Sequence, residues 1–363
     1  MKALLLGDLS PTVNTNPLFA KKDIETLFND VVSLFQGNDI NFVNLECALT
    51  ESDKKIEKFG PPLKAADETA DTLKMIGVTV CGLSNNHIFD FGKRGVEDTF
   101  RELDRVGLDY TGFGKNYEDS RKNYVVEKDG EKVCIIAVCE HEYSYALEDR
   151  MGSRPYDECD TMFDIRNAKA ENDRVIVIYH GGKEFCRYPS PRLRKLCRAM
   201  ADHGADVVLC QHSHCIGCYE EYHDSHILYG QGNFHFVNPD FDTAESWDTS
   251  LAVQYDTKAN AISFVPLATH EKNGIVIAKG EEKEEILKGF TKRNEELQNG
   301  KWQDGWHEFC ESVREFYTKV LALAFADGSE PIDDDLFGHF LDCEAHTDVW
   351  RELFKTYNHT NEK

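Results

Sequence analysis

Residues 207–214, Val-Val-Leu-Cys-Gln-His-Ser-His, place a short apolar run directly before two histidines. A short run rich in β-branched residues is typical of a buried β-strand. Similar runs alternate with segments of helical spacing: Ala3–Leu6, Phe42–Leu45, Val78–Leu83, Val133–Val138, Val175–Tyr179 and Ile227–Tyr229. This alternation predicts an α/β fold. Asp129-Gly130 has the composition of a two-residue hairpin turn, so we expect part of the sheet to be antiparallel.

The sequence changes character toward the C-terminus, where charged segments with helical spacing replace the strand-like runs. Glu281–Leu297 is one such segment, and Trp306–Val320 carries aromatic and aliphatic residues at helical spacing. A loop is expected at Gly328–Asp335, which contains the helix breaker Pro331. We therefore predict two parts, an α/β domain over residues 1–275 and a helical appendage over residues 276–363.

The composition excludes several classes of partner. The 363 residues include 41 Lys and Arg against 65 Asp and Glu, a formal net charge of −24. Nucleic acids and anionic membranes bind basic surfaces, so we expect neither as a partner. The apolar run after Met1 is too short for a signal peptide or a membrane span, and the twelve cysteines form no disulfide-like framework. We therefore expect a cytoplasmic protein with reduced thiols, and we draw no oligomeric state from the sequence.

Side chains of the kind that ligate metals follow the ends of several predicted strands. They are Asp8, Glu46, Asn86, His180, His212 and His214. The carboxyl ends of strands in α/β sheets are where ligands bind. Two carboxylates, an amide oxygen and three imidazoles suit Mn, Fe or Zn better than Mg. We therefore predict one or two divalent transition metals, whose charge would attract a small anionic or polyanionic substrate.

Each of these residues also has an ordinary structural explanation when it is taken alone. Asp8 could be a loop carboxylate, Glu46 a helix cap and His180 a turn histidine beside two glycines. His212 and His214 would point to opposite faces of an extended strand, and they converge on a metal only from a loop. The prediction therefore depends on the convergence of the whole set.

Six short motifs occur in a fixed order along the chain. They are Gly7-Asp8, Asn44-Leu45-Glu46, Asn85-Asn86-His87 with Asp90 and Gly92, His180-Gly181-Gly182-Lys183-Glu184, Gln211-His212-Ser213-His214 and Gly232-Asn233-Phe234. As a set, they resemble the CapA family of capsule and poly-γ-glutamate synthesis, a branch of the calcineurin-like metallophosphoesterases. The resemblance spans about residues 3 to 270 and implies a four-layer α/β/β/α sandwich of two mixed sheets.

The resemblance also implies a role for each candidate ligand. Asp8, Glu46 and His214 would hold one metal, and Glu46, as a bridge, would share the second with Asn86, His180 and His212. The chain departs from the broader superfamily at Ser10, which stands where a histidine ligand is usual, so the first metal has only three protein ligands. Glu46 stands where the superfamily has Asp, a change that the CapA branch shares.

The resemblance implies that His87 faces the substrate, where it would donate a proton to the leaving oxygen or stabilise the charge of the transition state. Asp90, three residues later, would orient the His87 ring by accepting its far N–H. An equally good explanation is that Asp90 caps the helix that follows. The sequence leaves both explanations open.

Other residues carry weaker signals. Arg187 and Arg192 could contact an anionic substrate or lie on the surface, and Asn233 could touch substrate or shape a turn. Glu184 could hydrogen-bond a ligand histidine or be solvated. Cys215-x-x-Cys218 could be a structural zinc or redox pair, but packed thiols are the commoner arrangement without a second pair.

The sequence supports one leading hypothesis for function, a metal-dependent hydrolase of the phosphoesterase type that uses a metal-activated water and His87 as proton donor. The alternative is a non-catalytic accessory protein of capsule or poly-γ-glutamate synthesis that binds polymer through its metal site. A third hypothesis is hydrolysis of a γ-glutamyl amide at the same metals.

Overall fold

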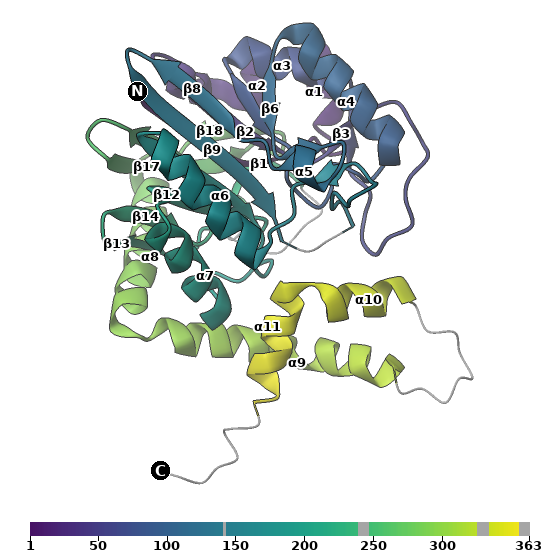
Figure 1. Ribbon diagram of the computed structural model, residues 1–363, viewed down its shortest axis with the longest axis vertical. Coiled ribbons are helices and arrows are strands. Elements are labelled where there is room, and N and C mark those ends of the chain that lie inside the picture. Colours follow the sequence, from purple (N-terminus) through teal and green to yellow (C-terminus); the bar gives the residue numbers. More distant parts are fainter. Residues whose placement is uncertain (141–142, 239–246, 325–333, 356–363) are drawn as a thin grey trace.

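The computed structural model of the protein describes residues 1–140, 143–238, 247–324 and 334–355. Its α/β part has four layers, with two mixed sheets packed face to face and helices on both outer faces (Figure 1). The predicted four-layer sandwich is confirmed. All seven predicted runs form strands.

The first sheet has a parallel half and an antiparallel half. In spatial order its strands are β18 (Gly274–Ile277), β17 (Ala261–His270), β16 (Thr249–Asp256), β1 (Lys2–Leu9), β2 (Ile40–Leu45), β5 (Val80–Gly82) and β6 (Asp109–Thr111), with β15 (Asn233–His235) also paired to β1. Strands β1, β2, β5 and β6 are parallel, whereas β16, β17 and β18 are antiparallel. The ends of the parallel strands supply Asp8, Glu46 and Asn86.

The second sheet supplies the histidines. Its order is β13 (Tyr219–Tyr222), β14 (Ser225–Leu228), β12 (Val207–Gln211), β11 (Arg174–His180), β9 (Glu131–Cys139) and β8 (Tyr124–Lys128). The β8–β9 hairpin turns at Asp129 and Gly130, whose φ angles of 53° and 78° are those that a two-residue primed turn requires. The predicted hairpin is confirmed.

Apolar side chains fill the space between the sheets. Leu5 and Phe42 of the first sheet pack in one cluster with Ile135 and Ile178 of the second, and all four are at most 2% exposed. Each such burial contributes about 1.5–3 kcal/mol. The face of the first sheet away from this cluster is covered by α1 (Asn16–Lys21), α2 (Ile24–Phe28), the 3₁₀ segment Asn29–Phe35, α3 (Thr69–Ile76) and α4 (Gly92–Val106). The opposite face of the second sheet is covered by α6 (Glu158–Glu171) and α7 (Pro191–Asp202).

Short elements connect these layers. They are α5 (Tyr117–Ser120) and the pairs β3 (Ala48–Leu49) with β4 (Lys64–Ala65) and β7 (Phe113–Gly114) with β10 (Gly152–Ser153).

The C-terminal part is helical, as predicted. Its helices are α8 (Gly280–Asn299), α9 (Trp302–Ala324), α10 (Asp334–Asp342) and α11 (Glu344–Leu353), and α9 to α11 gather beside one end of the sandwich (Figure 1). Helix α8 packs against β13 and β17, and its Phe290 is only 5% exposed in the cluster between the sheets. The division at residues 275 and 276 stays a prediction. Most of the loop expected at Gly328–Asp335, up to residue 333, lies outside the described residues. Its last two residues, Asp334 and Asp335, begin α10 instead.

Two further expectations concern membranes and thiols. Within the described parts of the chain, no helix has both the length and the apolar character needed to cross a bilayer. The twelve cysteines form no disulfide among the described residues, and Cys159 is the one that is exposed there. Cys215 and Cys218 are buried as packed thiols, and the Cys218 Sγ lies 3.4 Å from the carbonyl oxygen of Arg187.

Candidate metal centre

The six predicted ligands meet where the ends of strands from the two sheets come together. All six residues are buried: Asp8, Glu46, Asn86, His180, His212 and His214. They reach one place because β1, β2 and β5 of the first sheet end next to β11 and β12 of the second. The predicted convergence is therefore present, whereas the assignment of each residue as a ligand stays a prediction.

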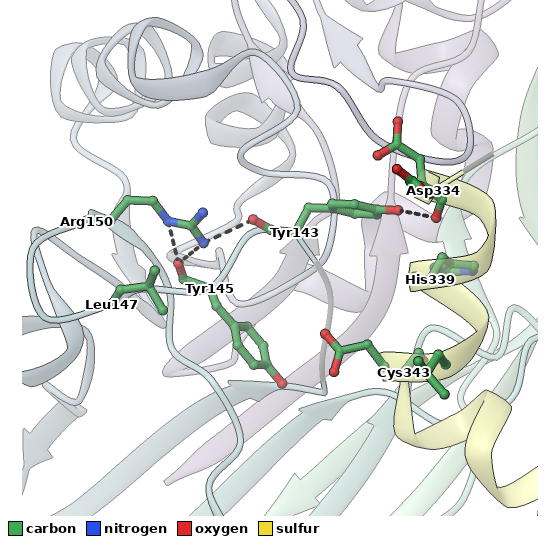
Figure 2. Close-up of a pocket in the computed structure, with 11 residues that line it drawn as sticks. Tyr143, Tyr145, Leu147, Arg150, Asp334, His339 and Cys343 are labelled. Carbon is green, nitrogen blue, oxygen red and sulfur yellow. Dashed lines mark hydrogen bonds between the residues drawn. The ribbon is translucent and has the colours of Figure 1, made fainter. Parts of the chain in front are cut away.

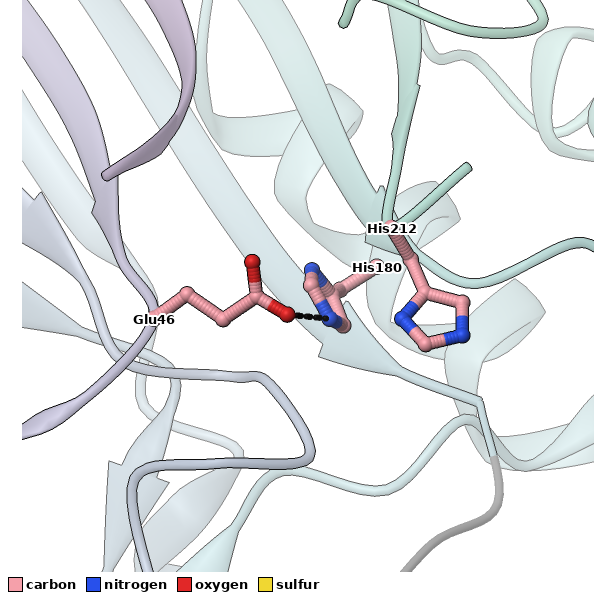
Figure 3. A group of neighbouring side chains, drawn as sticks. All are labelled: Glu46, His180 and His212. Atoms are coloured by element: carbon pink, nitrogen blue, oxygen red, sulfur yellow. Dashed lines mark ion pairs between the residues drawn. The ribbon is translucent and has the colours of Figure 1, made fainter. Parts of the chain in front are cut away.

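Glu46, His180 and His212 form one group (Figure 3). Each offers one ligand atom, and these three atoms lie within 4.8 Å of one another. His180 Nε2 is 3.3 Å from Glu46 Oε1 and 2.9 Å from the amide oxygen of Asn86. Asn86 thus joins this group through His180. The group contains the same four residues that the resemblance implies for one metal.

The second group is formed by Asp8, Glu46 and His214, also within 4.8 Å of one another. His214 Nδ1 donates to Asn233 Oδ1 at 2.8 Å and lies 3.7 Å from Asp8 Oδ2. Asn233 therefore orients a candidate ligand. Because both groups contain Glu46, its carboxylate is placed to bridge two ions.

Two glycines allow the backbone of β15 to approach β1 closely enough for this arrangement. A Cβ on Gly7 would lie 2.1 Å from the carbonyl oxygen of Gly232, a distance that no side chain tolerates. Gly232 has a φ of 76°, which favours glycine. The close approach places Asp8 in register with Asn233.

His212 and His214 lie in the turn after β12, as their convergence requires. Their φ angles are 79° and 53°, in the left-handed region that residues other than glycine rarely adopt. Strained backbone of this kind persists where surrounding contacts hold it, and it is common at functional sites. Here the His212 N–H donates to Asp8 Oδ2 at 2.9 Å, which ties the turn to the other sheet.

The buried charges of the site perturb one another. Burial alone would raise the pKa of Asp8, but His180, His214 and Asn44 outweigh it and hold that pKa well below its usual value. Burial alone would lower the pKa of His180, but Glu46 and Asp8 raise it to about 10. Burial, followed by the charge of His180, keeps the pKa of His212 well below its usual value. Without a metal, the site therefore retains a proton on His180 to offset its carboxylates.

Several buried polar atoms have no hydrogen-bond partner among the described residues. They include both carboxylate oxygens of Glu46 and Nδ1 of His212. A buried polar atom without a partner costs about 1–3 kcal/mol, so such atoms require an explanation. A buried set of carboxylate oxygens and imidazole nitrogens such as this one fits a divalent transition metal. Ser10 is also fully buried.

His87 is next to the candidate ligand Asn86 in the sequence and contacts Asp90. His87 Nδ1 is 2.7 Å from Asp90 Oδ2, and Lys58 Nζ is 2.5 Å from Asp90 Oδ1. Burial opposes ionisation of Asp90, but His87 and Lys58 outweigh it, so the pKa of this carboxyl lies below its usual value. The side chain of Asp90 does not cap the following helix, because α4 has Phe91 at its N-cap position and no side-chain cap. The structure therefore contradicts the capping explanation, and the role of Asp90 in orienting His87 stays a prediction.

Lys58 is a residue of this site that the sequence did not reveal. It lies in the irregular segment between β3 and β4, where neither helical nor strand spacing marks it. Its contact with Asp90 spans 32 residues of sequence. No local pattern signals such a contact.

The arginines predicted to meet substrate lie in other environments. Arg192 pairs with Glu140 and Asp348, and Glu140 also accepts the N–H of Gly182, so this guanidinium connects α11 to the turn after His180. Arg187 lines hollows beside α8. Glu184 has a 38% exposed side chain. Substrate contacts by both arginines and by Asn233 stay predictions.

Comparison with known proteins identifies relatives of this chain. The chain is 27% identical over 300 residues to a "Capsule biosynthesis protein CapA" of Bacillus anthracis, with 79% of this chain and 72% of the relative covered. It is 28% identical over 305 residues to a "PGA biosynthesis protein CapA" of Bacillus subtilis, with 80% and 78% covered. A "Probable polyglutamine synthesis accessory protein" of Mycobacterium tuberculosis is 27% identical over 210 residues, with 54% and 55% covered.

The similarity to solved structures is low. A putative 5′-nucleotidase from Staphylococcus aureus has a TM-score of 0.44 and 13% identity, with 79% of this chain and 57% of that chain covered. The family of bacterial capsule synthesis proteins called PGA_cap matches residues 2–238. The resemblance to CapA proteins is thereby confirmed, and the chain belongs to the PGA_cap family of bacterial capsule synthesis proteins.

Proposed function

We propose that the protein is a metal-dependent hydrolase, and that its reaction is the hydrolysis of a phosphate ester. The observation that carries this proposal is the pair of buried ligand groups that share the Glu46 carboxylate. Two ions that share a carboxylate lie about 3.5–4 Å apart in phosphoesterases and clamp the transferring phosphoryl group. A net charge of −24 makes such a local positive charge necessary for an anionic substrate.

The residues of this chain have separable roles in the proposed reaction. Bound metal would supply Lewis acidity, which lowers the pKa of a coordinated water and neutralises phosphoryl charge. Asp8, Glu46, Asn86, His180, His212 and His214 would hold it. His87 Nδ1 donates a hydrogen bond to Asp90 and keeps its proton. The other ring nitrogen, Nε2, would carry the proton that the leaving oxygen receives.

The setting of the reaction follows from the names of the relatives, which describe capsule, PGA and polyglutamine synthesis. We infer that the substrate belongs to the metabolism of such a polymer. An accessory role, in which the metals bind polymer without turnover, is the second candidate. It predicts polymer binding that survives His87→Ala, whereas the enzyme hypothesis predicts loss of turnover in the same variant.

The test begins with metal-free protein, prepared by chelation and reloaded separately with Mn, Fe, Zn or buffer alone. Each sample is assayed on aryl phosphate monoesters, aryl phosphate diesters and a γ-glutamyl anilide. Hydrolysis of an ester that depends on metal and is lost in Glu46→Gln supports the proposal. Hydrolysis of the anilide alone would assign the activity to amide bonds, and absence of turnover with every metal would refute the enzyme hypothesis.

A further inference from the structure

The carboxylate of Asp90 accepts three hydrogen bonds, and the donors come from two segments of the chain. Oδ1 accepts from Lys58 Nζ at 2.5 Å. Oδ2 accepts from His87 Nδ1 and from the Leu63 N–H, both at 2.7 Å. The Ile56 N–H also donates to the backbone carbonyl of Asp90 at 2.9 Å. The segment from Ile56 to Leu63 therefore wraps around the residue that orients His87.

Lys58 is an unusual member of this cluster because its side chain is only 4% exposed. Lysine is almost never buried unless its ammonium is paired. Here Nζ is 2.5 Å from Asp90 Oδ1 and 3.2 Å from His87 Nδ1. An ammonium offers only protons, and an ionised carboxylate offers only lone pairs. The His87 Nδ1 proton must therefore be donated to Asp90 and not toward Lys58.

The position of Lys58 is set from its outer side by aromatic residues. The N–H of Phe59 donates to the hydroxyl of Tyr143 at 3.0 Å, and Lys58 Nζ lies 5.8 Å from the centre of the Tyr143 ring. The Phe59 ring packs against His339 and Phe340 of α10, at centroid distances of 5.1 and 6.2 Å. Figure 2 shows the Tyr143 side chain directed toward α10, across a hollow of about 540 Å³.

We propose that Lys58 is a positioning residue, which holds the Asp90 carboxylate so that His87 keeps its Nδ1 proton in one hydrogen bond and presents Nε2 for proton transfer. This inference rests on the proposed function and deepens it by adding a third member to the His87–Asp90 pair. Without Lys58, Oδ1 loses its partner, and only the hydrogen bonds at Oδ2 hold the carboxylate. The His87 ring is then held less firmly in its orientation.

The first test does not require activity. In metal-free protein, the hydrogen-bonded Nδ1 proton of His87 should give a far-downfield ¹H resonance that exchanges slowly with solvent, identified by its loss in His87→Gln. We expect the resonance to broaden or vanish in Lys58→Met. It should remain in the matched control Lys55→Met, which removes an exposed lysine of the same segment. Circular dichroism and metal content verify that each variant is folded.

The second test uses kinetics. Loss of a residue that orients a catalytic group typically costs about 10–100-fold in activity. We expect Lys58→Met to lower kcat by this factor while KM is unchanged, and Lys58→Arg to restore part of the loss. Lys58→Gln, which keeps one donor without the charge, serves if the Met variant does not fold, and we expect it to lower kcat as well.

The outcomes separate this inference from the proposed function. If the wild-type protein hydrolyses nothing, the proposed function fails and the Nδ1 resonance alone decides the role of Lys58. If Lys58→Met, or Lys58→Gln in its place, keeps both the resonance and the kcat of the wild type, Lys58 is not a positioning residue.

Discussion

His87 Nδ1 and Asp90 Oδ2 lie 2.7 Å apart, three residues from each other in the sequence, just before α4. The Leu63 N–H donates to the same oxygen, so the carboxylate cannot turn to follow a moving ring. An imidazole that is fixed at one nitrogen has its other nitrogen aimed in one direction. This geometry gives His87 the orientation that a general acid needs.

We expect His87→Gln to lower kcat by about 10²–10⁴-fold, the usual contribution of a general acid. Asp90→Asn should cost less, about 10–100-fold, because it leaves the imidazole in place and weakens only its orientation. Steady-state kinetics on an aryl phosphate with a poor leaving group measures both losses. An equal rate for His87→Gln and wild type on that substrate would show that His87 is not the acid.

Metal binding should stabilise the fold, because an ion that binds only the native state adds free energy of unfolding. At a metal concentration 100 times the Kd the gain is about 2.7 kcal/mol. His212→Ala should abolish this gain, since it removes a ligand atom from one group. The matched control is His223→Ala, whose side chain is 73% exposed. Thermal unfolding with and without Zn or Mn measures the gain, and a gain in His212→Ala as large as in His223→Ala would place the metal elsewhere.

The strands and their order of appearance could be predicted because apolar β-branched runs depend only on local pattern. The strand pair β16 and β17 was missed. Strand β17 alternates between exposed and half-buried positions over much of its length and contains Pro266, so its pattern is weak. Its pairing with β16 is a long-range choice of the folded chain, and no local pattern predicts it.

The candidate ligands could also be predicted, because each lies at the end of a recognisable strand or in the few residues after it, and the ends of these strands share one edge. Sequence could not decide whether Asp90 caps α4 or orients His87, since both roles place an Asp before a helix. The structure contradicts the cap, because α4 has Phe91 at its N-cap position and no side-chain cap. The contact of Asp90 with Lys58 could not be predicted either, because Lys58 lies in an irregular segment. The left-handed φ angles of His212 and His214 were likewise invisible, although the convergence of the two rings requires them.

Metal uptake should release protons. In the metal-free protein the pKa of His180 is about 10, so the ring is protonated at neutral pH. A ligating imidazole must be neutral, and binding an ion therefore displaces about one proton from this residue. His212, with a depressed pKa, is already neutral and releases none. Affinity should rise as the pH approaches 10 and weaken as it falls.

Calorimetric titration of metal into the protein, in two buffers with different ionisation enthalpies, counts the released protons. About one proton per ion at neutral pH is expected for His180. An apparent binding enthalpy that is the same in both buffers would mean that no proton leaves, and that His180 is not a ligand.

The last prediction concerns the division of the chain at residues 275 and 276. Phe290 of α8 is 5% exposed and contacts the rings of Tyr219 and Phe264 in the two sheets. If α8 is part of the sandwich, Phe290→Ala should lower the free energy of unfolding by about 3–5 kcal/mol. Phe316→Ala is the matched control, because that ring is 51% exposed on α9. Denaturant unfolding measures both, and a variant at Phe290 as stable as wild type would make the C-terminal helices an independent appendage that begins with α8.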